Sequence, residues 1–275
     1  MSDQTWSVTT PQTIDVDGVA SLKLGMVRGR FDVVKHQEPV TRIEISDIHG
    51  DPVAVSLSGG RLEIRHQLHG AQGWFKNLMG AVNHNSENSA VVSIAVPDNV
   101  DVEAGIVSGD GLVAGISGHT RLNTVSGSVM ADGTDGELHV NTVSGEVTAR
   151  NHTGVLTAKS VSGEVTASGR LTNVRASTVS GDLSFDLQGV PLDFGSNSVS
   201  GDLTIRLPHD VGVDIVSKSA SGAVVIDNQR YAQAGGKVET IAGPDAKLML
   251  VRTNSVSGTT SIVHSTVAGN VEAGD

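Results

Sequence analysis

One short motif recurs along the chain: NTVSGSV at 123–129, NTVSGEV at 141–147, SVSGEV at 160–165, TVSGDL at 178–183 and SVSGDL at 198–203. Its glycine recurs every 18 residues from Gly109 to Gly181, and again 20 and 21 residues later at Gly201 and Gly222. A further Val-Ser-Gly ends at Gly258. A fixed period of this length is the sequence signature of an architecture in which one small unit stacks on the next.

Within a unit, apolar and polar residues alternate, which is typical of a β-strand with one buried face. Val143, Val147 and Ala149 share one parity, so all three are expected to point inward. Val140 in the preceding strand has the opposite parity, which predicts a corner near residues 141–142. Glycine suits such corners because it permits positive φ and close backbone approach.

Units of this kind bury their apolar faces only by stacking on their neighbours. The sequence therefore predicts an all-β chain in the form of a β-solenoid, a single-chain arrangement like a parallel β-helix. Composition agrees with this fold. The chain has 33 glycines but only 2 Trp, 1 Tyr and 4 Phe, so Val, Leu, Ile and Ala must fill a narrow core.

The motif begins only after the first hundred residues, which suggests two regions. Residues 1–100 show short alternating stretches and predict an N-terminal β-region that caps the open edge of the solenoid. Residues 101–275 hold the solenoid repeats, of about 18–21 residues each. Residues 228–247 contain Gly-Gly and Gly-Pro turns and predict a loop before the last coil.

An insertion at 70–89 breaks the β pattern and predicts a short helix or loop. Its apolar residues follow helical spacing and would share one face. That face is either a cap packed over the core or an apolar surface that docks a partner or a membrane-associated protein. The residues concerned are Trp74, Phe75, Leu78, Met79 and Val82.

Acidic residues follow the repeat glycine in four units and stack if the coils align: Glu146, Glu164, Asp182 and Asp202. Like charges one strand spacing apart repel by about 1 kcal/mol per pair in water, which exposure and salt make tolerable. Such a ladder is a plain charged surface, a binding site for a cationic partner, or a calcium site. The partner-binding interpretation makes these four residues candidate site residues.

No enzyme motif is present, and we expect no catalytic residue, no cofactor and no metal site. His66, His69 and His84 lack well-spaced further ligands and are expected to be ordinary surface residues. The serines of the repeat occur as many equivalents, whereas catalysis needs one activated serine, so they are expected to satisfy hydrogen bonds at the corners.

Charge and chain ends narrow the possible partners. The net charge of −11 without any basic run disfavours nucleic acid. No apolar stretch reaches the roughly 20 residues of a membrane helix, and no secretory signal is visible at the start. We therefore expect a cytoplasmic chain with no direct membrane span. The absence of cysteine excludes disulfides and thiolate chemistry.

The run SIAVPDNVDVEAGIVSGDGLVAGISGHTRLNTVSGSV from Ser93, with the tandem SVSGEV and SVSGDL units, resembles the bacterial adhesin-type β-strand-repeat domains of unknown function, also called Toastrack domains. The opening GRFDVVKHQEPVTRIEI from Gly29 is similar to their first strands. The resemblance covers roughly residues 15–265. It implies a β-solenoid that is often encoded together with envelope-stress membrane proteins and acts as an assembly scaffold, and it brings no catalytic residues.

Two functions follow as expectations. The first is a non-enzymatic scaffold or interaction module that binds a protein partner or a second copy of itself, in envelope-stress or membrane-associated signalling assemblies. The alternative is a carbohydrate-binding adhesin or a carbohydrate-active β-helix enzyme. A groove with clustered, unlike carboxylates and exposed rings would favour the alternative, and flat regular faces the first.

Overall fold

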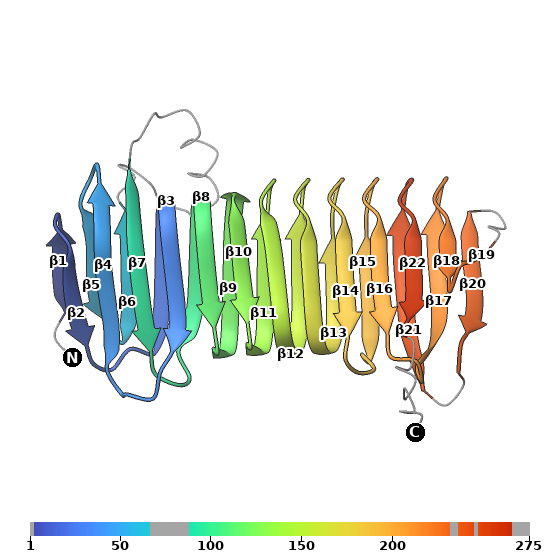
Figure 1. Cartoon of the computed structure of the whole chain (residues 1–275), viewed down its shortest axis with the longest axis horizontal. Coiled ribbons are helices and arrows are strands. Elements are labelled where there is room, and N and C mark those ends of the chain that lie inside the picture. Colours follow the sequence, from blue (N-terminus) through green and yellow to red (C-terminus); the bar gives the residue numbers. More distant parts are fainter. Residues whose placement is uncertain (1–2, 67–87, 232–235, 245–246, 266–275) are drawn as a thin grey trace, which may run out of the picture.

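The chain forms an elongated all-β stack with two layers of strands, shown in Figure 1. The computed structural model describes residues 3–66, 88–231, 236–244 and 247–265. Within these ranges no helix is long and apolar enough to cross a membrane. The helix or loop expected at 70–89 lies almost wholly outside the described residues, which resume at residue 88.

The first layer consists of strands that pair side by side along the long axis. In spatial order they are β1 (Gln4–Val8), β5 (Val53–Ser58), β6 (Arg61–His66), the start of β3 (Ser21–Lys35), the start of β8 (Asp101–Ala114), β9 (Ser117–Ser126), β11 (Asp135–Thr142), the ends of β12 (Glu146–Ser160) and β13 (Val165–Ser177), β15 (Asp193–Asn197), β21 (Leu248–Ser255), β17 (Gly212–Ser219) and β20 (Lys237–Ala242).

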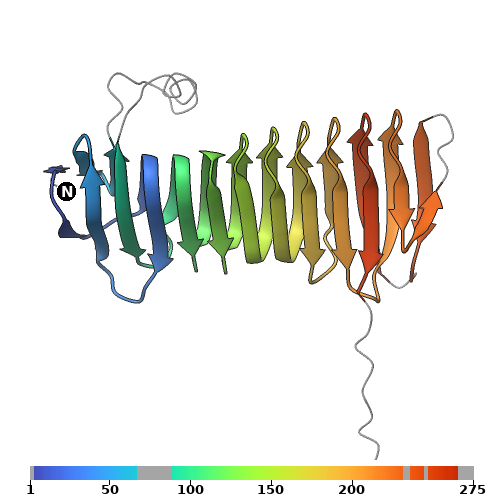
Figure 2. The same ribbon diagram turned by 45° about the horizontal axis from the view of Figure 1, so that its top comes forward.

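The second layer packs face to face with the first, lies in front of it in the view of Figure 1 and is joined to it by corners (Figures 1 and 2). In the same order it holds β2 (Gln12–Val16), β4 (Thr41–His49), β7 (Ser89–Val96), the ends of β3 and β8, β10 (Ser128–Asp132), the starts of β12 and β13, β14 (Leu183–Leu187), β16 (Leu203–Leu207), β22 (Thr260–His264), β18 (Val224–Ile226) and β19 (Gln229–Tyr231). Four long strands, β3, β8, β12 and β13, therefore run through both layers.

Neighbouring coils pair in parallel at equivalent positions of the repeat. Val129 pairs with Val147, Val147 with Val165, and Val165 with Leu183, so the partners are 18 residues apart. The expectation of an all-β chain is confirmed. Parallel pairing at the period of the motif is also the pairing that stacked coils require.

Aliphatic ladders fill the space between the layers. Leu138, Leu156 and Val174 are fully buried in successive coils, and the same cluster continues to both ends of the stack. Rings enter it at few places. Phe185 and Phe194 meet edge to face with ring centroids 5.0 Å apart near the C-terminal end.

The valine of the motif points outward, which corrects the sequence expectation for Val143. Leu138, Val140 and Thr142 alternate with outward residues and are all buried, so the strand continues as far as Thr142. The corner therefore begins at residue 143 and not before it. Val147 and Ala149 are buried as expected. The parity count failed because it treated Val143 as the start of the second strand, whereas it belongs to the turn.

The glycine of the motif is required by close approach between coils. A Cβ built on Gly163 would lie 2.0 Å from the carbonyl oxygen of Gly145, and one built on Gly181 would lie 2.0 Å from that of Gly163. The same contact at 2.1 Å relates Gly201 to Gly181 and Gly258 to Gly201. No side chain fits between adjacent corners, so each coil tolerates only glycine there.

The spatial order of the coils differs from their sequence order at both ends. The coil of β21 and β22 lies between the coil of β15 and β16 and the coil of β17 and β18. Likewise β3 lies between β6 and β7 on one side and β8 on the other. Parallel pairing therefore crosses residue 100, and the division of the chain at that point stays a prediction.

The expected loop at 228–247 contains two strands instead, which is a second correction. β19 pairs antiparallel with β18, and β20 pairs antiparallel with β17. These hairpin strands cover the C-terminal edges of both layers, as the antiparallel β1 and β2 do at the other end. Short end strands of this kind protect a sheet edge from pairing with another chain.

We predict that Gly163→Ala lowers the stability of the stack by about 2–4 kcal/mol, because its methyl group would overlap a backbone carbonyl that cannot rotate away. Thermal or urea unfolding followed by circular dichroism measures this. Gly189→Ala is the matched control, since a Cβ there meets nothing within 4 Å. Equal losses in the two variants would contradict the requirement for close approach.

Candidate functional site

A hollow lies on the first layer, toward the N-terminal half of the stack. Its volume is about 470 Å³, and its lining comes from β3, β6, β8, β9 and β11. Lys23 and Glu103 form an ion pair within it, with 3.4 Å between Nζ and Oε1. Parallel pairing brings residues from separate coils together here, because equivalent positions of successive coils lie side by side.

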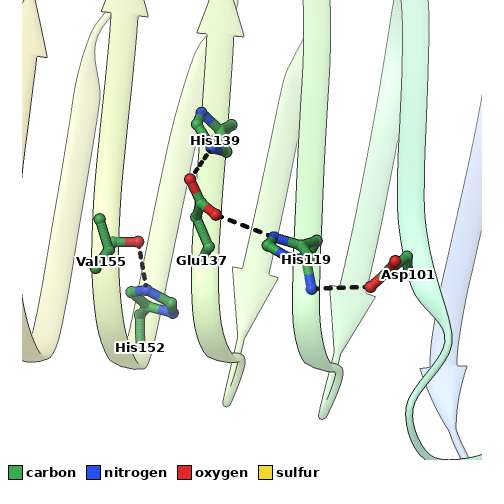
Figure 3. Close-up of polar contacts among 6 residues, drawn as sticks. All are labelled: Asp101, His119, Glu137, His139, His152 and Val155. Atoms are coloured by element: carbon green, nitrogen blue, oxygen red, sulfur yellow. Dashed lines mark hydrogen bonds and ion pairs between the residues drawn. The ribbon is translucent and has the colours of Figure 1, made fainter.

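Glu137 is the centre of the polar network in this hollow (Figure 3). Its Oε1 lies 2.6 Å from Nε2 of His139, and its Oε2 lies 3.0 Å from Nδ1 of His119. The backbone N–H of His119 donates to Oδ1 of Asp101 at 3.2 Å. His119 pairs directly with Glu137 across neighbouring strands, and His139 follows two residues later on the same face.

The two histidines set the protonation state of Glu137. The hydrogen bond from His139 is the main cause that holds the pKa of Glu137 below its usual value, and the charges of His139 and His119 act in the same direction. A carboxyl group that stays ionised accepts hydrogen bonds but is a poor proton donor. The arrangement can therefore bind a polar or cationic group, and it lacks the raised pKa expected of a general acid.

No cluster of three potential metal ligands occurs among the residues that the structure describes. His66 is buried, and its Nε2 lies 2.7 Å from the carbonyl oxygen of Asp51. This burial contradicts the expectation of a surface histidine at this position, and it arises because His66 ends β6 on the inward parity. His69 and His84 lie outside the described residues.

The corners form a second candidate surface, the upper rim of the stack in Figure 1. The four acidic residues predicted from the repeat lie in successive coils at this rim and are exposed: Glu146, Glu164, Asp182 and Asp202. Their role in binding a partner stays a prediction, and so does the calcium hypothesis.

Two of these carboxylates also hold the coils together, a role that sequence reasoning missed. Oδ1 of Asp182 accepts the backbone N–H of Asp202 at 3.0 Å, and Oδ1 of Asp202 accepts that of Thr259 at 2.7 Å. A backbone amide is thereby satisfied where the strand pairing is interrupted by the corner.

The serines of the motif form the corner ladder that was expected. Ser126, Ser144 and Ser162 donate to the carbonyl oxygens of the preceding coil at 3.0–3.2 Å. Two residues before the motif serine, a second hydroxyl is also used: Thr142 donates to the carbonyl oxygen of Gly145 at 2.7 Å, and Ser160 donates to that of Gly163 at 2.5 Å. Each of these hydroxyls thus donates a hydrogen bond within the corner.

The outward valines make an exposed apolar row, here called the valine stripe. Its members are Val161, Val179, Val199 and Val256, with exposed fractions of 47%, 48%, 47% and 52%. Sequence reasoning placed them in the core. The signal that could have located them is the Thr or Ser three residues before each glycine, which keeps the inward parity to the end of the strand.

The remaining predicted site residues are Trp74, Phe75, Leu78 and Met79. They lie outside the described residues, so their proposed partner surface stays a prediction.

A buried histidine, His152, lies within β12 at the register shift where this strand passes from the second layer to the first. His152 is 1% exposed, and Nδ1 lies 3.0 Å from the carbonyl oxygen of Thr134. Nε2 lies 3.2 Å from the carbonyl oxygen of Val155 (Figure 3). Burial is the main cause that lowers the pKa of His152, although both carbonyls oppose it.

We predict that His152 makes the fold less stable in mild acid. Because its folded-state pKa lies below the unfolded value of 6.5, the unfolded chain binds the proton more readily, and stability is lost as the pH falls through and below about 6.5. The melting temperature of the wild type should fall more between pH 7.5 and 5.5 than that of His152→Gln. Equal decreases would show that His152 does not contribute.

The Toastrack DUF4097 family model matches residues 43–262. No curated protein matches this chain significantly.

Solved structures resemble the chain at low sequence identity. A "putative lipid binding protein" from Parabacteroides distasonis is 14% identical, with a TM-score of 0.54, over 94% of this chain and 98% of that one. A "putative cell adhesion protein" from Clostridium sporogenes is 14% identical, with a TM-score of 0.31, over 93% and 100%. A "putative adhesin" from Bacteroides fragilis is 11% identical, with a TM-score of 0.42, over 94% and 99%.

Likeness at this identity concerns the fold alone, and the family model concerns the sequence. That model covers most of the described chain, including every coil with the Val-Ser-Gly motif. The protein belongs to the Toastrack family.

Proposed function

We propose that the chain is a non-enzymatic β-solenoid scaffold that binds protein partners along its corner rim. The observation that supports this most directly is the valine stripe, because it exposes one apolar side chain per coil over four successive coils. Contiguous exposed apolar surface on a folded chain is typical of an interaction site.

Repetition favours a scaffold over an enzyme. Most coils present the same Val-Ser-Gly corner, followed by an acidic residue in most of the central coils, so the rim is long and nearly uniform. Catalysis instead needs one group set apart from its neighbours by its environment. A uniform ladder offers many equal contacts, which suits recognition of an elongated partner.

The partners that we propose are a protein or a second copy of the chain. From the family resemblance, we further propose that the protein partner belongs to a membrane-associated, envelope-stress assembly, with the scaffold on the cytoplasmic side.

A carbohydrate-binding adhesin or carbohydrate-active enzyme is the second candidate, and the hollow around Glu137 is the observation that favours it. Asp101 and Glu137 lie two coils apart there, with His119 between them and His139 beside Glu137. Two features oppose it: the lowered pKa of Glu137 and a lining without any Trp, Tyr or Phe side chain for a sugar ring.

Site-specific photo-crosslinking in cells that produce the protein tests the scaffold. We expect a photoreactive residue at Ser180, on the rim, to yield a discrete adduct with a protein. The same residue at Thr204, on the outer face of the second layer, is the control and should yield less. The absence of any protein adduct at the rim would contradict the proposal.

The purified chain and Glu137→Gln distinguish the second candidate. We expect neither to release reducing ends from neutral or acidic polysaccharides. Turnover by the wild type that the Glu137→Gln variant lacks would establish the enzyme instead.

A further inference from the structure

The valine stripe is a continuous surface and not a set of scattered residues. Ser180 N donates to Val161 O at 2.8 Å, Ser200 N to Val179 O at 2.9 Å, and Val256 N to Val199 O at 3.2 Å. The four valines therefore lie in adjacent coils, about 4.8 Å apart. Val256 joins the stripe only because its coil is inserted out of sequence order.

Packing does not account for these valines. The corner is held by the glycine, by the serine and threonine hydroxyls and by backbone hydrogen bonds, none of which uses a valine side chain. A polar residue would satisfy the same turn. Single exposed valines need no explanation. An aligned row of them lowers the solubility of the chain and indicates a surface that a binding partner covers.

The stripe continues into a recess at its N-terminal end. Val143 and Val161 line a hollow of about 190 Å³ together with Asn141, Lys159 and the residues beside them. The apolar row is therefore bordered by a depression that can receive a side chain of an occupant.

Acidic residues line the side of the rim where the second layer begins. Glu164, Asp182 and Asp202 lie three residues after Val161, Val179 and Val199, across each corner. Within the described chain none of these carboxylates forms an ion pair; they accept hydrogen bonds from a threonine hydroxyl or from a backbone amide. Two copies of this rim would bring acidic ladders together, so charge favours a cationic occupant over self-association.

The spacing of the stripe favours a helix over a strand. An α-helix repeats a face every 5.4 Å, which differs from the coil spacing by about 0.6 Å per coil. A β-strand running along the rim repeats a face only about every 6.8 Å and loses register after one coil. Four coils thus match about four turns of one helix.

We propose that the rim is the binding site for an amphipathic helix of a partner protein, and that the apolar side of this helix lies on the valine stripe. Lysine and arginine residues flank that side and reach across the corners to Glu164, Asp182 and Asp202. This inference rests on the proposed scaffold function and gives the chemistry of the partner.

A direct binding measurement tests it. The probe is a fluorescent model helix of about four to five turns made of leucine and lysine, with leucines on one face, and fluorescence anisotropy with the full chain gives Kd. A scrambled peptide of the same composition, which has no apolar face, controls for charge alone. We expect the helix to bind at least tenfold more tightly than the scrambled peptide.

Two sets of variants locate the site. Val179→Ser/Val199→Ser should weaken binding by about tenfold or more, because two half-exposed valines lose their apolar contact. The matched control is Val34→Ser/Val263→Ser, which changes two exposed valines of the second layer and should leave Kd within about twofold.

The charge variant is Asp182→Asn/Asp202→Asn. Asparagine keeps the Oδ1 acceptor for the next coil, so the fold is retained while the charge is lost. It should weaken binding and reduce its dependence on salt, whereas Asp186→Asn, an exposed acid away from the rim, should do neither.

Absence of binding, equal binding of the scrambled peptide, or an unchanged Kd in the valine variant would overturn the inference. The outcome separates from that of the scaffold proposal. A protein adduct at Ser180 together with any of these results would leave the scaffold standing and remove only the helix as its partner.

Discussion

The contact on which the structure depends is the approach of one corner glycine to the carbonyl of the glycine in the coil below. Because no Cβ fits there, the backbones of adjacent corners lie against each other, and the same close contact recurs at 2.0–2.4 Å from Gly145 to Gly201. This contact fixes the rest of the rim. It turns the valine outward, directs the serine hydroxyl to the coil below and leaves the acidic residue exposed beyond the glycine.

The ends of the stack solve a problem that the repeat creates. A stack of parallel coils ends in two open edges in each layer, and the terminal coil is held on one side only. Here a coil distant in sequence is inserted next to each end, and antiparallel strands close the edges. The inserted coil of β21 and β22, the last along the chain, is paired on both sides, so it separates only if strand pairing breaks on both sides.

The sequence predicted the parts of the fold that follow from repetition. The period gave parallel pairing of residues 18 apart, and the alternation located Val147 and Ala149 in the core. It could not locate Val143, because parity is continuous only within a strand and the first residue of a turn belongs to neither neighbour. The sequence also could not predict that the coil of β21 and β22 is inserted between two earlier coils. Equivalent repeats pair equally well in any spatial order, and only the connecting segments determine which order the chain adopts.

The two candidate surfaces were predictable to different degrees for the same reason. The acidic ladder is repeated, so alignment of the motif was enough to predict its stacking. The hollow around Glu137 depends on residues that differ from coil to coil, with Asp101, His119 and Glu137 at one position and His139 two residues further on. Such a site can be recognised only when the pairing register of the strands is known for each residue.

This contrast also bears on what each surface can recognise. A surface built of unlike residues at one place matches a small, compact group, and it can change without affecting the next coil. A surface built of like residues at constant spacing matches only something that has a similar spacing of its own. The conformation of the corner already needs the glycine and the hydroxyl, but it does not need the valine. The exposed valine is therefore the residue of the corner that the fold does not require, yet it recurs in four adjacent coils. Folding does not explain this regular row of valines, whereas binding of a partner with a regular spacing would.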